Sequence, residues 1–215
     1  MRVEVKFCGL TRAEDARVAA DLGARYAGVI FAGGPRHLEA SRARDVLDGA
    51  GTGVARVGVF GRSDAATIAN IAREARLDIV QLHADPTVGD VQAVADATGA
   101  RVWAVVRVSD DRTPDDFHEL WEASDALVLD SKAKAALGGT GVAFDWSAVE
   151  KAARDHARPL VVAGGLTAAT VAQAIEMLSP DIVDVSSGVE LSPGIKDHRR
   201  MQEFMDAVGR ARVLR

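Results

Sequence analysis

Cys8 is the only cysteine of the 215-residue chain, and it lies where an alternating run of apolar residues ends in Gly9. Side chains alternate between the two faces of a strand, so Cys8 and Lys6 point to the face opposite Phe7. A lone cysteine often packs as a small buried apolar residue, whereas an accessible thiol can act as a base. Both interpretations are open at this point.

Asp130 ends another apolar run, Ala126-Leu127-Val128-Leu129. A carboxyl group in this position is either an acid that protonates a substrate or an ordinary loop residue. If the two strands belong to one eight-stranded barrel, strands one and six lie roughly across it, and Cys8 would face Asp130 over the opening. That arrangement suits a base and an acid that work on opposite faces of one substrate.

Two glycine-rich turns, Ala163–Thr167 and Ser186–Glu190, follow the last two predicted strands. Glycine allows close approach of the backbone, and N–H groups at a helix start favour anions. The turns are either simple tight connections or a phosphate site, and their adjacency favours phosphate. The candidate residues are Gly164, Gly165, Ser186, Ser187 and Gly188. Gly141 joins them from the long loop 131–144, which is either a lid or an insertion.

Four further polar residues are candidates for substrate binding. Arg36 is either a solvated loop residue or a bidentate partner for a carboxylate. Gln81 and His83 share one face of the fourth predicted strand, although a single histidine is more often structural. Asp184 needs a partner if it is buried, either a sugar hydroxyl or Lys6.

Short Val/Ile/Leu-rich runs alternate with helical patterns along the whole chain. Strands are predicted at Val3–Phe7, Tyr26–Phe31, Val54–Phe60, Asp78–His83, Arg101–Val108, Ala126–Asp130, Pro159–Ala163 and Ile182–Ser186. Helices are predicted at Ala13–Leu22, Ser41–Leu47, Asp64–Ala75, Thr87–Thr98, Pro114–Ala123, Trp146–His156, Thr167–Leu178 and Asp197–Val208. Eight such units predict an α/β fold, a single (β/α)8 TIM barrel over residues 1–215.

The polarity of each strand predicts which face lines the barrel. The inward face is expected to carry Lys6, Cys8, Arg56, Gln81, His83, Arg107, Asp130 and Asp184. Val57 and Val59, among other apolar residues, are expected to face outward under the helices. Thr11, Ser41, Ser63 and Thr167 are predicted to cap helix starts.

The composition limits the function classes. A hydrophobic content of 48% supports a large core, and a net charge of −5 argues against a non-specific nucleic-acid surface. A single cysteine excludes an internal disulfide and a thiolate-rich zinc site, and it fits a reducing cytoplasm. No leader peptide and no apolar run of membrane-spanning length is recognised. The histidines show no metal-ligand spacing.

The ordered motifs resemble the phosphoribosylanthranilate isomerase family over essentially the full chain. They are Lys6–Thr11, Pro35-Arg36, Val57–Phe60, Gln81–His83, Leu129–Ser131, Gly138–Gly141, Phe144–Trp146, Ala163–Leu166, Asp184–Glu190 and Pro193–Asp197. Two positions depart from the family pattern, with Gly34 in place of the usual serine and Ala84 in place of the usual glycine.

The resemblance implies an Amadori rearrangement of N-(5-phosphoribosyl)anthranilate to the 1-deoxyribulose 5-phosphate derivative in tryptophan biosynthesis. It implies that Cys8 is the general base, Asp130 the general acid and Arg36 the partner of the anthranilate carboxylate. It further implies a small phosphosugar substrate, no metal, no cofactor, and a monomer or homodimer in the cytoplasm.

Two other readings stay open from the sequence. Another phosphosugar barrel enzyme, such as a ketopentose-phosphate epimerase or the aminoimidazole-carboxamide isomerase of histidine synthesis, would need metal ligands or an aspartate in place of Cys8. A non-catalytic phospholigand-binding barrel would explain the glycine turns but not the pairing of Cys8 with Asp130.

Overall fold

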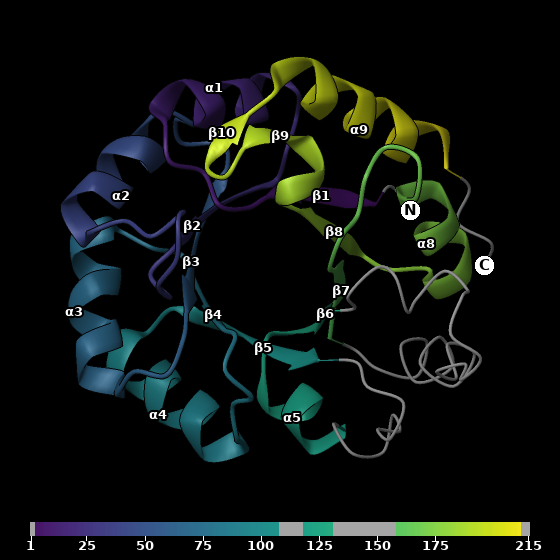
Figure 1. The fold of residues 1–215 in the computed structure, drawn as a ribbon. Coiled ribbons are helices and arrows are strands. Elements are labelled where there is room, and N and C mark those ends of the chain that lie inside the picture. The colour runs from purple at the N-terminus through teal and green to yellow at the C-terminus, as the bar shows by residue number, and fades with distance from the viewer. Residues whose placement is uncertain (1–2, 108–117, 131–157, 212–215) are drawn as a thin grey trace.

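Eight parallel strands close into a barrel in which β1 pairs with β8 (Figure 1). The computed structural model describes residues 3–107, 118–130 and 158–211. The strands are β1 (Glu4–Phe7), β2 (Tyr26–Ile30), β3 (Ala55–Phe60), β4 (Ile79–Leu82), β5 (Arg101–Arg107), β6 (Ala126–Asp130), β7 (Leu160–Ala163) and β8 (Ile182–Val185). The predicted barrel is therefore confirmed, and the strand boundaries agree closely with the prediction.

The described helices form a layer around the strands (Figure 1). They are α1 (Ala13–Asp21), α2 (Ala40–Asp48), α3 (Ala65–Ala75), α4 (Val88–Thr98), α5 (His118–Ala123), α8 (Val171–Leu178) and α9 (His198–Arg210). In α9 the buried residues Met201, Phe204 and Val208 recur at helical spacing, which gives the helix one apolar stripe. The predicted helix at Trp146–His156 lies outside the described residues.

The predicted helix caps are wrong in all four places. The residues at the N-cap positions are Arg12 for α1, Glu39 for α2, Asp64 for α3 and Thr170 for α8. Asp64 accepts a hydrogen bond from the Thr67 N–H, as a capping side chain should. The Thr11 hydroxyl instead donates to the Gly194 carbonyl at 2.5 Å, so it links two distant loops.

Strand register shows which side chains point into the barrel. Lys6 lies opposite Asp184, and Val59 lies opposite Gln81, so all four share the inner face. Val57 packs in the interior cluster with Ile79 and Trp103. The prediction that Val57 and Val59 face outward is therefore wrong.

Arg56, which was predicted to face inward, is on the outside of the barrel. Its Nη2 donates to Asp48 Oδ1 of α2 at 2.7 Å. The error arose because polarity was used to choose the inner face of β3. Here the polar residue pairs with a helix end, and the valines fill the barrel floor.

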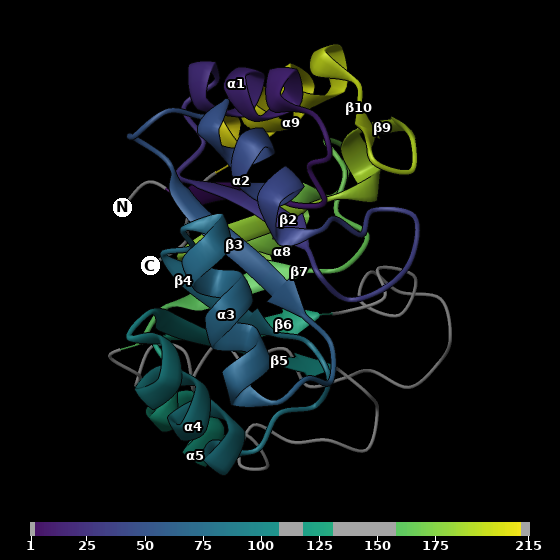
Figure 2. The same ribbon diagram turned by 90° about the vertical axis from the view of Figure 1, so that its left-hand side faces the viewer.

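A segment after β8 was not predicted. It contains a short 3-10 helix, η2 (Ser187–Val189), and a hairpin of β9 (Glu190–Ser192) and β10 (Ile195–Lys196). Figure 2 shows this hairpin projecting beyond the strands at the end where β2 runs into its following loop. Gly194 makes the turn with a φ of 84°, a conformation that favours glycine. Lys196 of β10 donates hydrogen bonds to the carbonyls of Cys8 and Ser186, so the hairpin lies over the C-terminal ends of β1 and β8.

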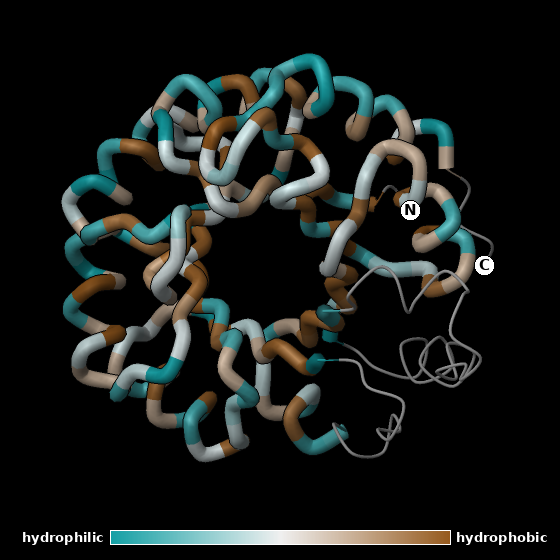
Figure 3. Tube along the Cα trace, in the orientation of Figure 1, coloured by the Kyte–Doolittle hydropathy of each residue, from teal (hydrophilic) through white to brown (hydrophobic). Residues whose placement is uncertain are grey.

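Apolar residues concentrate on the strands and on the helix turns that face them, and polar residues lie along the outer turns (Figure 3). None of the helices in the described part of the chain combines the length and apolar character that crossing a bilayer requires. The single-domain assignment over residues 1–215 stays a prediction, because several segments lie outside the described residues.

Candidate active site

A cavity of about 320 Å³ opens at the C-terminal ends of the strands. In such barrels this end carries the active site. It is lined by Cys8, Ile30, Ala32, Arg36, Val59, Gln81, His83, Asp130, Ala163, Gly164, Gly165, Leu166, Asp184, Ser186 and Ser187. The cavity thus brings together every described candidate residue from the sequence except Gly188.

Cys8 lies beside a buried ion pair. Lys6 Nζ is 2.6 Å from Asp184 Oδ2, and the side chain of Lys6 has no exposed surface. The prediction that Asp184 could brace Lys6 is confirmed. Cys8 is 7% exposed and lines the cavity, so it is neither sealed in the hydrocarbon core nor freely solvated.

The surroundings of Cys8 act on its pKa in opposite directions. Burial raises the pKa of the thiol above its ordinary value of 9.0; Lys6 and Lys196 oppose this rise, while Asp184 adds to it. The net direction is upward, because burial outweighs the lowering by the two lysines. Lys6 moderates the cost of forming the thiolate without making the thiolate the resting form.

Gly28 of β2 leaves space for the side chains of Lys6 and Cys8. A Cβ atom at position 28 would lie 3.1 Å from Lys6 Cε and 3.2 Å from Cys8 Sγ. Both distances are tighter than ordinary van der Waals contact, so any larger residue would press on the thiol. Gly28 was not among the predicted site residues, because its contact with Cys8 depends on the pairing of β1 with β2, which the sequence pattern does not show.

Asp130 ends β6 and contacts His83 from the end of β4. The distance between His83 Nε2 and Asp130 Oδ2 is 3.3 Å, and both side chains are partly exposed to the cavity. Three buried polar atoms in this region have no hydrogen-bond partner among the described residues: Gln81 Oε1, His83 Nδ1 and Asp184 Oδ1. Unpaired buried polar atoms are costly, and a bound polar ligand would satisfy them.

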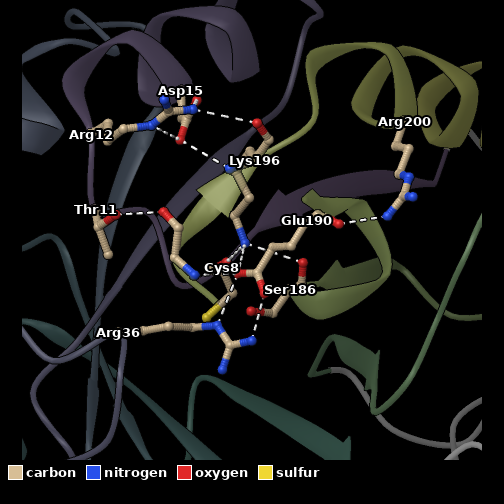
Figure 4. Close-up of polar contacts among 10 residues, drawn as sticks. Cys8, Thr11, Arg12, Asp15, Arg36, Ser186, Glu190, Lys196 and Arg200 are labelled. Atoms are coloured by element: carbon tan, nitrogen blue, oxygen red, sulfur yellow. Dashed lines mark hydrogen bonds and ion pairs between the residues drawn. The ribbon is translucent and has the colours of Figure 1, made fainter. Parts of the chain in front are cut away.

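Arg36 forms a two-bond ion pair with Glu190 of β9. Arg36 Nε donates to Glu190 Oε1 at 2.8 Å, and Nη2 donates to Oε2 at 2.5 Å (Figure 4). A Cβ atom at Gly9 would lie 2.6 Å from Arg36 Cδ, so glycine is required for the arginine stem to cross the loop after β1. Arg36 is therefore held at the rim and is not a freely solvated loop residue.

The turn after β7 depends on two glycines, and the turn after β8 packs against it. Gly164 and Gly165 have φ values of 96° and 64°, which favour glycine. Their N–H groups make no hydrogen bond within the described part of the chain. Gly188 does not line the cavity; a Cβ there would lie 1.9 Å from the Leu166 carbonyl oxygen, so this glycine lets the two turns pack together. Gly141 lies outside the described residues.

One departure from the family pattern has a local reason. Gly34 adopts a φ of 103°, and a Cβ there would meet no atom within 4 Å. A serine at this position would be strained by its backbone and not by its neighbours. Ala84 lies outside the cavity that holds Cys8 and lines a separate one between the loops that precede α3 and α4.

Two charged residues of the site were missed by the sequence reading. Glu190 and Lys196 appear only as parts of family motifs, and both are buried beside Cys8 and Arg36. The available signal was the Pro193-Gly194 pair between two short alternating segments, which is typical of a hairpin turn. A hairpin directly after strand eight must lie at the rim of the barrel.

Comparisons with known proteins agree with this geometry. Residues 5–207 match the family model described as N-(5'phosphoribosyl)anthranilate (PRA) isomerase. The chain is 41% identical over 212 residues to an N-(5'-phosphoribosyl)anthranilate isomerase of Paracoccus denitrificans, covering 95% of this chain and 96% of that protein.

Solved structures give the same result. The phosphoribosyl anthranilate isomerase of Thermotoga maritima superposes with a TM-score of 0.82 at 34% identity, covering 96% of this chain and 98% of that chain. A phosphoribosyl anthranilate isomerase in complex with reduced 1-(o-carboxyphenylamino)-1-deoxyribulose 5-phosphate superposes with a TM-score of 0.81 at 32% identity, covering 96% and 98%. The chain therefore belongs to the N-(5'-phosphoribosyl)anthranilate (PRA) isomerase family.

Proposed function

We propose that the protein catalyses the Amadori rearrangement of N-(5'-phosphoribosyl)anthranilate to 1-(2-carboxyphenylamino)-1-deoxyribulose 5-phosphate in tryptophan biosynthesis, with Asp130 as general acid and Cys8 as general base. Family membership supports the reaction. The observation that carries the residue assignment is that Cys8 and Asp130, which come from strands on different sides of the ring, line one cavity.

The first step opens the furanose ring. Asp130, in its protonated form, transfers a proton to the ring oxygen, and the bond between this oxygen and C1 breaks. The nitrogen lone pair forms a C1–N double bond, which gives a protonated Schiff base. The contact between His83 Nε2 and Asp130 Oδ2 places two side chains that can exchange a proton side by side at the cavity.

The second step removes a proton from C2 of the sugar. Cys8, as a thiolate, takes this proton, and the C–H electrons form a C1–C2 double bond while the C1–N pair returns to nitrogen. The positive charge created by ring opening lies close to the sulfur and favours the thiolate at that moment. This charge offsets the raised pKa that burial gives Cys8 in the free enzyme.

The last step converts the enolamine to the ketone, as the C2 hydroxyl loses its proton and C1 gains one. The protonated imine of the substrate itself accepts the electron pair during the second step. The scheme therefore needs proton donors and acceptors only, and the protein supplies them on two sides of the cavity.

The remaining cavity residues are assigned to substrate binding. Arg36 is positioned for the anthranilate carboxylate, and the unpaired atoms of Gln81, His83 and Asp184 suit sugar hydroxyls. The N–H groups of the two glycine turns suit the 5'-phosphate, with Gly164, Gly165, Ser186 and Ser187 at the cavity wall and Gly188 behind it. The proposed phosphate role of Gly141 rests on the sequence alone, because this residue lies outside the described part of the chain.

Further properties of the protein follow as parts of the same proposal. A small phosphosugar is the partner, and the chain acts as a monomer or a homodimer. A cytoplasmic location fits a single free cysteine in a chain without disulfides.

The test is a turnover assay that follows the loss of anthranilate-type fluorescence when purified protein converts freshly prepared PRA. Wild-type protein is expected to turn over the substrate, and it should bind the reduced product analogue in competition with it. Absence of turnover by a folded wild-type protein would contradict the proposed function.

A further inference from the structure

Lys196 of β10 is a lysine with no exposed side-chain surface at the edge of the active site. Its Nζ donates to the Cys8 carbonyl at 2.6 Å, to the Ser186 carbonyl at 3.1 Å and to Glu190 Oε1 at 2.8 Å (Figure 4). All three partners can only accept hydrogen bonds, so the nitrogen must supply three N–H groups. Burial lowers the pKa of Lys196, and the hydrogen bond and charge of Glu190 oppose this. Because three acceptors surround the nitrogen, we assign Lys196 as a charged ammonium group.

The Glu190 carboxylate lies between two cations. Oε1 contacts both Lys196 and Arg36, and Oε2 contacts Arg36 alone, while the Gly194 N–H donates to Oε1 at 3.2 Å. Burial by itself would raise the pKa of Glu190, but the hydrogen bonds and charges of Arg36 and Lys196 outweigh it and lower the pKa to about 2. The carboxylate is thus ionised and is shared by two positive groups.

Only one of these charged groups reaches the cavity. Arg36 lines it, whereas Glu190 and Lys196 lie behind the arginine. Glu190 occupies Nε and Nη2 of the guanidinium, which leaves Nη1 without a partner in the described part of the chain. An anion in the cavity therefore meets the remaining edge of an arginine whose other edge is held rigidly.

The charge balance of this cluster depends on Lys196. A bidentate arginine–carboxylate pair alone has no net charge and attracts a further carboxylate weakly. With Lys196 present, two positive charges share one negative charge, and the cluster keeps a net positive charge in a region with little solvent. Lys196 is not among the residues that line the cavity, so it reaches a ligand carboxylate through Glu190 and Arg36, while its contacts with the Cys8 and Ser186 carbonyls hold the cavity wall.

We propose that Lys196 is a positioning residue for the aryl carboxylate of the substrate, because its charge compensates Glu190 and leaves Arg36 effectively cationic toward the cavity. The inference rests on the proposed function, since it takes the carboxylate as part of the substrate. It differs from a simple structural role, in which Lys196 would only staple the Cys8 and Ser186 loops together.

The test compares two ligands that differ only in the carboxylate. One is reduced 1-(o-carboxyphenylamino)-1-deoxyribulose 5-phosphate, and the other is the same compound built on aniline. Lys196→Met is expected to weaken binding of the carboxylated ligand by about tenfold or more and to change binding of the aniline ligand by less than about threefold. Equal losses for both ligands would show a structural role only and would overturn the proposal.

Two further variants keep the test informative if Lys196→Met folds poorly. Lys196→Met combined with Glu190→Gln removes both charges and leaves Arg36 with the same net charge as the wild-type cluster. It should therefore keep the wild-type preference for the carboxylated ligand over the aniline ligand within about threefold. Glu190→Gln by itself leaves two cations and should show no selective loss of the carboxylated ligand. A selective loss in either variant, relative to wild type, would overturn the proposal.

The proposed function is tested separately by wild-type turnover of PRA, measured first. If the wild type turns over PRA and Lys196→Met shows no selective loss, the proposed function stands and only the role of Lys196 fails. If the wild type binds the carboxylated ligand but does not turn over PRA, the proposed function fails, and the ligand comparison still decides the role of Lys196.

Discussion

Lys6 and Asp184 form a buried ion pair, 2.6 Å apart, directly next to the thiol of Cys8. The two residues are opposite each other in the register that joins β1 to β8, so the pair forms where the barrel closes. Replacing one partner of such a pair leaves the other charge buried without compensation. The pair therefore links the closure of the fold to the electrostatics of the site.

Lys6→Met should lower the free energy of unfolding by about 3–5 kcal/mol, because it strands the Asp184 carboxylate. Chemical denaturation at neutral pH measures this change. Arg25→Met is the control, since its contact with Glu4 is exposed and should contribute below about 1 kcal/mol. Lys6→Met combined with Asp184→Asn should recover part of the loss; a further additive loss would contradict the stranded-charge explanation.

Cys8→Ser should reduce turnover by about 10²- to 10⁴-fold, the range expected when a general base is removed. Binding of the reduced product analogue should stay within about threefold of wild type, because serine keeps the size of the side chain and touches the same cavity. Fluorescence turnover and competition binding measure the two quantities. Near-normal turnover in this variant would exclude Cys8 as the base.

The pH dependence follows from the raised pKa of Cys8. Burial lifts the thiol pKa above 9.0, so the thiolate fraction of the free enzyme rises with pH throughout the neutral range. The wild-type scheme also needs Asp130 protonated, so a gain in thiolate is opposed by loss of the acid, and the rise is best read in Asp130→Asn, which has no acid to lose. The residual kcat/KM of Asp130→Asn should rise by about tenfold per pH unit on the alkaline side of neutrality until the thiol ionises. The residual activity of Cys8→Ser should lack this rise; a flat Asp130→Asn profile between pH 7 and 9 would contradict the assignment of Cys8 as the base.

Asp130→Asn should lose turnover by about 10²- to 10⁴-fold with its melting temperature nearly unchanged, because Asp130 is partly exposed and contacts His83 only loosely. Asp85→Asn is a matched control at the same rim: its contact with Arg107 is 3.7 Å long and exposed. Asparagine also tolerates the φ of 50° found there. Robust turnover in Asp130→Asn would remove this residue from the scheme.

Gly28→Ala should reduce kcat, because the new methyl group would press on Cys8 Sγ and Lys6 Cε and shift the thiol. It should also lower the free energy of unfolding. Overpacking of this kind costs about 1–3 kcal/mol. Gly53→Ala is the control, since a Cβ there meets no atom within 4 Å. Steady-state kinetics and thermal unfolding of both variants decide the point; an unchanged kcat in Gly28→Ala would show that the thiol has room to move.

The alternation of strands and helices was enough to predict the barrel, because each strand is short, apolar and followed by a helical pattern. Side-chain alternation also placed Cys8, Gln81 and Asp184 on the inner face correctly. It failed for Arg56, because a polar residue on the outside of β3 can pair with a helix end such as Asp48. The polarity of a strand residue alone therefore does not show whether its side chain points into the barrel or outward to a helix end.

The supporting residues of the site could not be predicted from spacing. Lys196 is 188 positions from Cys8, and Glu190 is 154 positions from Arg36. Their contacts depend on a hairpin that lies over two loops, and no periodic pattern encodes such a meeting. The sequence does show the motif in which both residues occur, but the charge shared between them requires the fold.

The pairing of β1 with β8 also has a consequence for synthesis of the chain. During translation β1 leaves the ribosome first. Asp184 and Lys196, whose charges act on the Cys8 thiol, emerge only after most of the polypeptide has been made. Until those segments dock, the nascent protein carries an ordinary unpaired thiol and no shaped pocket. The reactive centre is thus assembled as the ring shuts, so prematurely terminated fragments lack it even though they contain the key sulfur atom.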